Sequence, residues 1–237
     1  MFLLILKFKI NKISWEKNMK NILIVVTNTK EFKDKTPTGV YLEEFMSPYL
    51  MFKDEGFKVE VTSILGGNSP IDPSSMPEDM NESWKNSLDI LKNTKKLEEI
   101  DYSNFDAIFF PGGHGPMFDL AYYEPLCEIL NYFYDKNKVI AAICHGVCAL
   151  IPSIDNYNIW LFNNKNLTSF TNKEEKLAKK VEMVPFLLET KLKQLGAKFQ
   201  EYPPFAKNVV VDGKLITGQN QNSAQLIASE IINSLCK

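Results

Sequence analysis

The residues best suited to chemistry lie in the stretch AAICHGVCAL, residues 141–150, where His145 directly follows Cys144. The chain has only two histidines, so this pairing raises the question whether both residues serve one reaction. A cysteine between a strand and a helix lies near the positive end of the helix dipole, which favours the reactive thiolate. Cys144 is therefore a candidate nucleophile, and the alternative is a buried, inert thiol.

His145 could orient or protonate a reacting group, or it could be an ordinary polar residue at the start of a helix. Adjacent side chains on a regular strand or helix point apart, so the two residues can cooperate only on an irregular turn. The sequence favours such a turn, because Gly146 lets the backbone pass tightly. A sharp turn presenting Cys144 and His145 together is therefore one prediction.

A second group with chemical potential is PGGHG, residues 111–115. Glycines such as Gly112 and Gly113 let the backbone approach a ligand closely and direct N–H groups at developing negative charge. His114 in the same group could line a pocket. The alternative is a plain turn, because a short glycine cluster alone is a weak signal.

A metal site would require Cys144, His145, Cys148 and His114 to converge. The two cysteines are four residues apart and could share a helix face, but the histidines do not follow the spacing of zinc sites. We therefore expect no metal and no cofactor, and we expect Cys148 to pack in the core.

The elements that must position these groups alternate along the chain. Continuous apolar runs predict buried strands at 21–27, 105–110 and 138–143, and an alternating pattern predicts another at 57–65. Helices are expected at about 39–54, 84–100, 126–133, 185–195 and 223–235. This order predicts an α/β, flavodoxin-like or Rossmann-like doubly wound sheet, mostly parallel and sandwiched by helices. Both chemical groups would then follow carboxyl ends of strands, where such folds bind ligands.

Further strands are expected at 167–170, 197–202 and 208–218, the last divided by Asp212-Gly213 into a hairpin. The long loop at 66–80 is rich in Pro, Ser, Asp and Gly, which is typical of a lid or binding element.

The composition of the chain limits which binding partners and which cellular compartment are expected. The net charge of −2 gives no electrostatic basis for binding nucleic acid or an anionic membrane, and all 27 basic residues are lysines. Four scattered cysteines suit a reducing cytoplasm. The apolar start is too short and too often interrupted by lysine for a signal peptide or a membrane span. Residues 1–18 are expected to be a peripheral extension, alternatively an edge strand or short helix, before a single domain over 19–237.

Several ordered blocks together resemble the ThiJ/PfpI superfamily, which has the class I glutamine amidotransferase-like fold. Within it the chain is most similar to the heat-shock-protein-31-like, or glyoxalase III, branch. The blocks are KTPTGVYLEEF (35–45), FDAIFFPGGHGPMFDL (105–120), AAICHGVCAL (141–150), LTSFTNKEE (167–175) and VVVDGKLITGQNQNSA (209–224).

The resemblance implies a site in which Cys144 is the nucleophile and His145 its partner. It assigns Glu44 to a hydrogen bond with the cysteine and Glu175 to orienting the histidine, although neighbouring Glu43 and Glu174 fit nearly as well. It also implies an oxyanion hole from the N–H groups of Gly113 and His145, with Gly112 and His114 beside the substrate. Residues 66–100 would form a cap.

By resemblance, the expected activity is glutathione-independent conversion of methylglyoxal or related 2-oxoaldehydes to 2-hydroxy acids such as lactate. The thiolate would add to the aldehyde, and His145 or Glu44 would move a proton through an enediol. The chain would act as a homodimer on small carbonyl compounds. The alternatives are a stress-response holding chaperone or redox sensor, and a cysteine peptidase or amidase. A glutaminase is disfavoured, because no histidine lies far downstream.

Overall fold

The fold is built on one seven-stranded sheet, seen in a computed structural model that describes residues 19–237. The strand order is β3-β2-β1-β4-β5-β9-β8, and every neighbouring pair is parallel except β8 with β9. The strands are β1 (Asn21–Val26), β2 (Lys58–Ser63), β3 (Lys95–Lys96), β4 (Ala107–Phe110), β5 (Val139–Ile143), β8 (Val209–Asp212) and β9 (Leu215–Gly218). The predicted doubly wound, mostly parallel sheet is confirmed.

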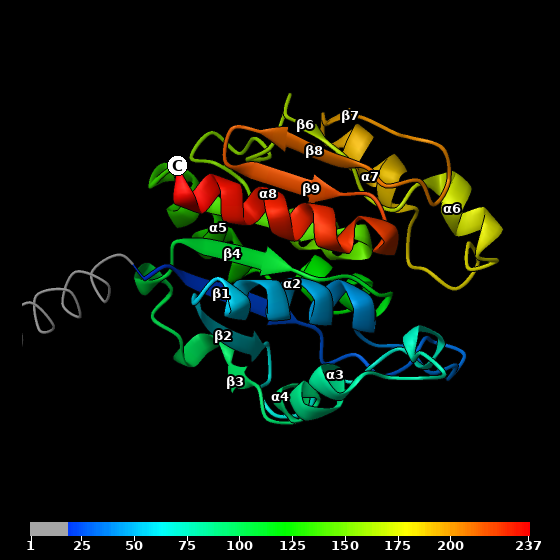
Figure 1. Ribbon diagram of the computed structural model, residues 1–237. Helices are drawn as coiled ribbons and strands as arrows, with labels where there is room; N and C mark the ends of the chain where they lie inside the picture. Colours follow the sequence, from blue (N-terminus) through cyan, green and yellow to red (C-terminus); the bar gives the residue numbers. More distant parts are fainter. Residues whose placement is uncertain (1–18) are drawn as a thin grey trace, which may run out of the picture.

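Both faces of the sheet are covered, which explains why the central strands are continuously apolar. Every residue of β4 and β5 is buried. Helices α2 (Leu42–Asp54) and α8 (Ala224–Cys236) lie side by side on one face (Figure 1). Helix α5 (Leu126–Asp135) covers the other face, where Leu130 and Phe133 pack with Leu23 of β1. Burial on both faces requires apolar side chains on successive residues, as the sequence shows.

The expected helix at 84–100 is wrong, because the chain divides there into shorter pieces. These are α3 (Glu82–Ser87), α4 (Asp89–Lys92) and β3, followed by a 3₁₀ turn at Leu97–Glu99. The Thr94 hydroxyl hydrogen bonds with Ser63 and with the carbonyl of Gly67, which holds the chain against the sheet edge. Apolar spacing that resembled one helix therefore serves two short helices and an edge strand.

The segments at 167–170 and 197–202 form only the two-residue strands β6 (Asn166–Leu167) and β7 (Lys198–Phe199). They pair with each other in a separate small sheet. This sheet lies beyond β8 together with α6 (Asn172–Leu177) and α7 (Leu188–Gln194) (Figure 1). Helix α6 was not predicted. The hairpin at Asp212-Gly213 is confirmed.

The remaining helical segments are 3₁₀: five are single turns of three residues, and Cys144–Leu150 is seven residues long. They span Pro73–Ser75, Tyr102–Asn104, Gly115–Met117, Leu120–Tyr122, Cys144–Leu150 and Gln221–Ser223. The expectation for residues 1–18 lies outside the described residues. Within residues 19–237, no helix combines the length and apolarity that crossing a membrane requires.

Candidate active site

Cys144 occupies a sharp turn directly after β5. Its φ is +57°, in the left-handed region that residues with a β-carbon rarely adopt. Ile143 before it is still extended, and a 3₁₀ helix rather than the expected α-helix begins at Cys144. Gly146 is required here, because a β-carbon would lie 2.3 Å from the carbonyl oxygen of Phe110 at the end of β4. The predicted irregular turn is confirmed, and holding a non-glycine residue there costs about 1–3 kcal/mol.

The environment of the Cys144 thiol differs from the expectation based on a helix dipole. The side chain is buried, and burial, followed by the charge that Glu44 would carry when ionised, raises the pKa of the thiol well above its usual value. The resting cysteine is therefore protonated and needs a base. His145 offers one, because its Nδ1 lies 3.4 Å from the Cys144 Sγ.

Glu44 reaches the same sulfur from the first turn of α2. The residue is fully buried, and Oε2 accepts a 2.8 Å hydrogen bond from the Gly112 N–H. Burial raises its pKa to about 8, although hydrogen bonds with Cys144 and Gly112 oppose this. Among the described residues, Oε1 is buried without a hydrogen-bond partner. Glu43 instead accepts a hydrogen bond from Ser47, so Glu44 is the glutamate that faces the cysteine.

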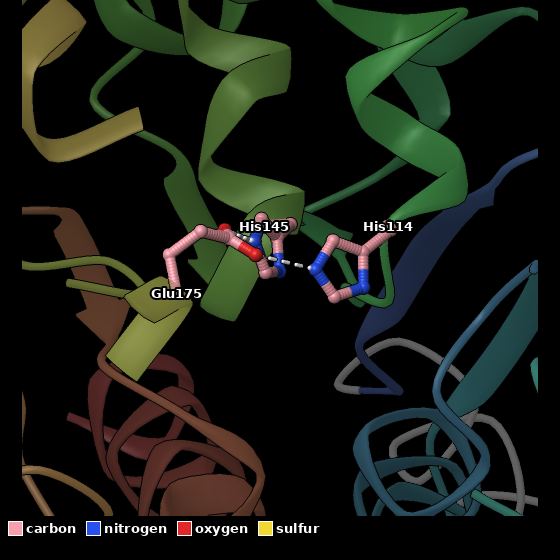
Figure 2. A group of neighbouring side chains, drawn as sticks. All are labelled: His114, His145 and Glu175. Atoms are coloured by element: carbon pink, nitrogen blue, oxygen red, sulfur yellow. Dashed lines mark hydrogen bonds and ion pairs between the residues drawn. The ribbon is translucent and has the colours of Figure 1, made fainter. Parts of the chain in front are cut away.

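Glu175 on α6 joins both histidines of the chain (Figure 2). Oε2 lies 2.6 Å from Nε2 of His145, and Oε1 lies 2.9 Å from Nε2 of His114. The ring centroids are 4.0 Å apart. Burial alone would raise the pKa of Glu175, but the two histidines lower it well below its usual range. An ionised carboxylate only accepts hydrogen bonds, so both Nε2 atoms carry hydrogen and Nδ1 of His145 is free to accept from the thiol.

His114 is held neutral in this arrangement. Burial, and secondly the charge that His145 would carry, lower its pKa to about 4. Its ring also packs against Phe32, with centroids 5.3 Å apart. His114 therefore lies beside Cys144 and His145 as a neutral hydrogen-bonding group in the wall of the site.

Neighbouring Glu174 has a structural task. Its Oε2 accepts from the N–H and the hydroxyl of Thr171 in a capping box at the start of α6. Its Oε1 accepts from Gln219, Asn220 and the N–H of Phe205. Successive residues of a helix point about 100° apart, so anchoring Glu174 in this way turns Glu175 toward the histidines. The signature T-x-x-E at 171–174 could have predicted α6 from the sequence.

The glycines of PGGHG are required by close packing. A β-carbon on Gly112 would lie 2.5 Å from Glu44 Oε2, and one on Gly113, where φ is +89°, would lie 2.3 Å from the Gly39 carbonyl oxygen. The Gly112 N–H is donated to Glu44, so its contribution to the site is to fix that carboxyl group. The oxyanion-hole roles of the Gly113 and His145 N–H groups stay predictions.

Two neighbouring cavities open at these residues. The inner cavity, of about 250 Å³, is lined by Cys144, His145, His114, Gly113, Tyr41, Asp72, Ser74, Phe170, Ala178, Lys180, Phe205 and Gln221. The outer cavity, of about 420 Å³, is lined by Tyr41, Glu43, Ser75, Pro77, Trp84, Lys207, Gln221, Asn222 and Gln225. From the segment expected to be a cap, Asp72 and Ser74 reach the inner cavity. The aromatic residues and Lys180 were not predicted, because they come from separate loops and helix ends.

The group His114, His145 and Glu175 also has the composition of a metal site. One ligand atom from each lies within 4.8 Å of the others. The same atoms already hydrogen bond with one another, so the arrangement is accounted for as a carboxylate that orients two imidazoles.

Comparison with known proteins gives concordant results. Residues 36–234 match the DJ-1/PfpI family. The glutathione-independent glyoxalase hsp3101 of Schizosaccharomyces pombe is 29% identical over 221 residues, covering 85% of this chain and 89% of the relative. The solved structure of glyoxalase III from Candida albicans is 28% identical with a TM-score of 0.78, covering 92% and 98%. Rapid Encystment Protein 24 kDa of Francisella tularensis is 38% identical with a TM-score of 0.86, covering 92% and 99%.

Proposed function

Because the chain belongs to the DJ-1/PfpI family, as the sequence resemblance predicted, we propose that it is a glutathione-independent glyoxalase. It converts methylglyoxal or related 2-oxoaldehydes to 2-hydroxy acids. One observation carries the proposal: the Cys144 sulfur lies between Glu44 and a His145–Glu175 pair at the wall of a small cavity. The relatives that are named glyoxalases match this chain over most of its length.

The first step makes the nucleophile. His145 Nδ1 takes the Cys144 proton, and the ionised Glu175 stabilises the resulting imidazolium at Nε2. The thiolate then adds to the aldehyde carbon, and the His145 imidazolium gives its proton to the aldehyde oxygen, which yields a hemithioacetal and neutral His145. The Gly113 and His145 N–H groups stabilise the developing oxyanion. Glu44 is largely protonated at neutral pH, because its pKa is about 8, and it can donate a hydrogen bond to the sulfur.

The second step moves hydrogen between two carbons. A base removes the proton from the hemithioacetal carbon to give an enediol, and reprotonation of the adjacent carbon gives a thioester of the 2-hydroxy acid. His145 suits this role better than Glu44, because a carboxyl group that is already protonated cannot accept the proton.

The last step is hydrolysis. Water attacks the thioester carbonyl, the carbon–sulfur bond breaks, and the Cys144 thiolate leaves and is reprotonated. Methylglyoxal plus one water equals lactic acid, with one carbon oxidised and its neighbour reduced. The sum therefore balances without any added oxidant or reductant.

The direct test incubates the purified protein with methylglyoxal in the absence of any thiol and quantifies lactate. Wild type and Cys236→Ala, which removes an exposed thiol far along α8, are expected to form lactate, whereas Cys144→Ala is not. Wild-type protein that consumes no methylglyoxal yet prevents aggregation of a client protein would overturn the proposal in favour of a holding chaperone.

A cysteine peptidase or amidase is a second candidate, because Cys144, His145 and Glu175 have the hydrogen-bonding order of a catalytic triad. Unlike a glyoxalase, such an enzyme would cleave a panel of fluorogenic peptide and amide substrates in a manner abolished by Cys144→Ala. We expect no such turnover.

The assembly and location belong to the same proposal. We propose a homodimer in the cytoplasm, formed by one domain over residues 19–237 with residues 66–100 as its cap, acting on a small carbonyl compound without a cofactor. Light scattering coupled to size-exclusion chromatography tests the dimer, and a particle with the mass of one chain would contradict it.

A further inference from the structure

The two cavities at the site have two wall residues in common. Tyr41 and Gln221 line both the inner cavity, which contains Cys144, and the outer cavity, which does not. A three-carbon aldehyde bound to Cys144 needs only the inner cavity of about 250 Å³. The outer cavity, of about 420 Å³, is therefore space into which the remainder of a longer substrate can extend.

The outer cavity carries hydrogen-bonding groups that are not in use. The side-chain amides of Gln221 and Gln225, the Lys207 ammonium and the Trp84 indole N–H make no hydrogen bond with another residue between 19 and 237. By contrast, the side-chain N–H of Asn222 in the same wall already donates a hydrogen bond to the Phe205 carbonyl. A ligand with several hydroxyl groups would satisfy the unused donors and acceptors together.

The charges of the outer cavity favour a neutral ligand. One acidic side chain, Glu43, and one basic side chain, Lys207, line it, so neither sign dominates. Trp84, partly buried against the core, adds an aromatic surface on which an aliphatic chain can pack. An aromatic surface among amides and opposite charges suits a polyhydroxylated chain better than an anion or a purely apolar group.

We propose that the outer cavity is a subsite for the neutral polyhydroxylated chain of sugar-derived 2-oxoaldehydes. The aldehyde of such a compound reacts at Cys144, and its hydroxylated carbons extend past Tyr41 and Gln221 toward Trp84 and Gln225. The reaction is the one proposed above, with the chain in place of the methyl group, and this inference rests on that function.

The test compares kcat/KM for two substrates, methylglyoxal and the six-carbon 3-deoxyglucosone. The ratio of the second value to the first is expected to fall by about tenfold in Trp84→Ala and by about threefold in Gln225→Ala. Trp84→Phe keeps an aromatic surface and is expected to restore most of the ratio. Gln225→Ala alters an exposed residue on α8, so it tests the subsite even if Trp84→Ala fails to fold.

Lys198→Ala, an exposed lysine outside both cavities, serves as the control for Lys207→Ala, and only the latter is expected to lower the ratio. Turnover of methylglyoxal without turnover of 3-deoxyglucosone, or a ratio unchanged in both Trp84→Ala and Gln225→Ala, would overturn the subsite alone. Absence of turnover with either substrate would instead overturn the proposed function together with the subsite.

Discussion

Cys144 and Cys148 lie on the same 3₁₀ helix, and both are buried. Burial is also the largest cause that raises the pKa of each thiol. Their surroundings differ. Cys144 contacts Glu44 and His145 and lines the inner cavity, whereas Cys148 packs among apolar residues such as Leu126 and Leu150 on the other face of the sheet. Neighbouring acid and base groups with access to a cavity distinguish a candidate nucleophile from a core thiol, and burial does not.

Among the substitutions that test the difference between the two cysteines, Glu175→Gln is expected to cause the largest loss of activity at the Cys144 site. The glutamine amide is uncharged and has one acceptor oxygen, so it cannot replace the carboxylate that accepts hydrogen bonds from both histidines. His145 therefore loses the group that orients it and stabilises its charged form. We expect kcat for lactate formation to fall by about 10³-fold. Steady-state kinetics with methylglyoxal measures this.

Glu174→Gln is the matched control for that change. It weakens the capping box and the contacts to Phe205 and Asn220, so it should lower the melting temperature with a much smaller loss of kcat. Equal losses of kcat in the two variants would contradict the assignment of Glu175 to the site.

Removing the Glu44 carboxyl group beside the Cys144 sulfur is expected to have the next largest effect on kcat. Glu44→Gln preserves the shape of the side chain but eliminates the ionisable carboxyl group beside the sulfur. We expect kcat to fall by about 10²-fold, and we expect alkylation of Cys144 by iodoacetamide to change its pH dependence. An unaltered pH profile for alkylation would show that Glu44 does not act on the thiol.

Glu44 should also affect how stability depends on pH. Its pKa rises from 4.5 to about 8 on folding, so between these values the folded state holds a proton that the unfolded state releases. The free energy of unfolding of the wild type, relative to Glu44→Gln, should therefore fall as the pH rises through this window. Urea unfolding at a series of pH values measures this difference. A wild type that becomes more stable relative to Glu44→Gln as the pH rises would refute the buried, protonated state.

The smallest effect is expected at Cys148. Cys148→Ala removes a core sulfur without touching the site, so kcat should stay within about threefold of the wild type. The free energy of unfolding should fall by about 1–2 kcal/mol because a small cavity is left behind. A loss of activity as large as that in Glu175→Gln would remove the distinction between the two cysteines.

Much of the site was predictable because the carboxyl ends of parallel strands lie at the same edge of a sheet. Continuous apolar runs placed β4 and β5, and the groups after them, Pro111–Gly115 and Cys144–His145, then had to lie at one edge of the sheet. The choice between Glu43 and Glu44 was not predictable from the residues alone. It depends on the rotation of α2, which is set by packing with α8 and the sheet.

Other features depended on distant contacts. Phe170 and Phe205 reach the inner cavity from separate loops, and neither carries a local pattern that indicates it. The state of the Cys144 thiol was also misjudged, because helix-dipole reasoning ignores the desolvation that dominates a buried group. Helix α6 was missed although its capping box is visible in the sequence at Thr171 and Glu174.

The central claim is that Cys144, and not Cys148, carries out glutathione-independent conversion of a 2-oxoaldehyde. The most direct test follows ¹³C-labelled methylglyoxal by NMR with wild type, Cys148→Ala and Cys144→Ala under identical conditions without added thiol. Wild type and Cys148→Ala are predicted to convert the label to lactate, while Cys144→Ala leaves it unreacted. Lactate formed by Cys144→Ala at the wild-type rate, or none formed by the wild type, would contradict the claim.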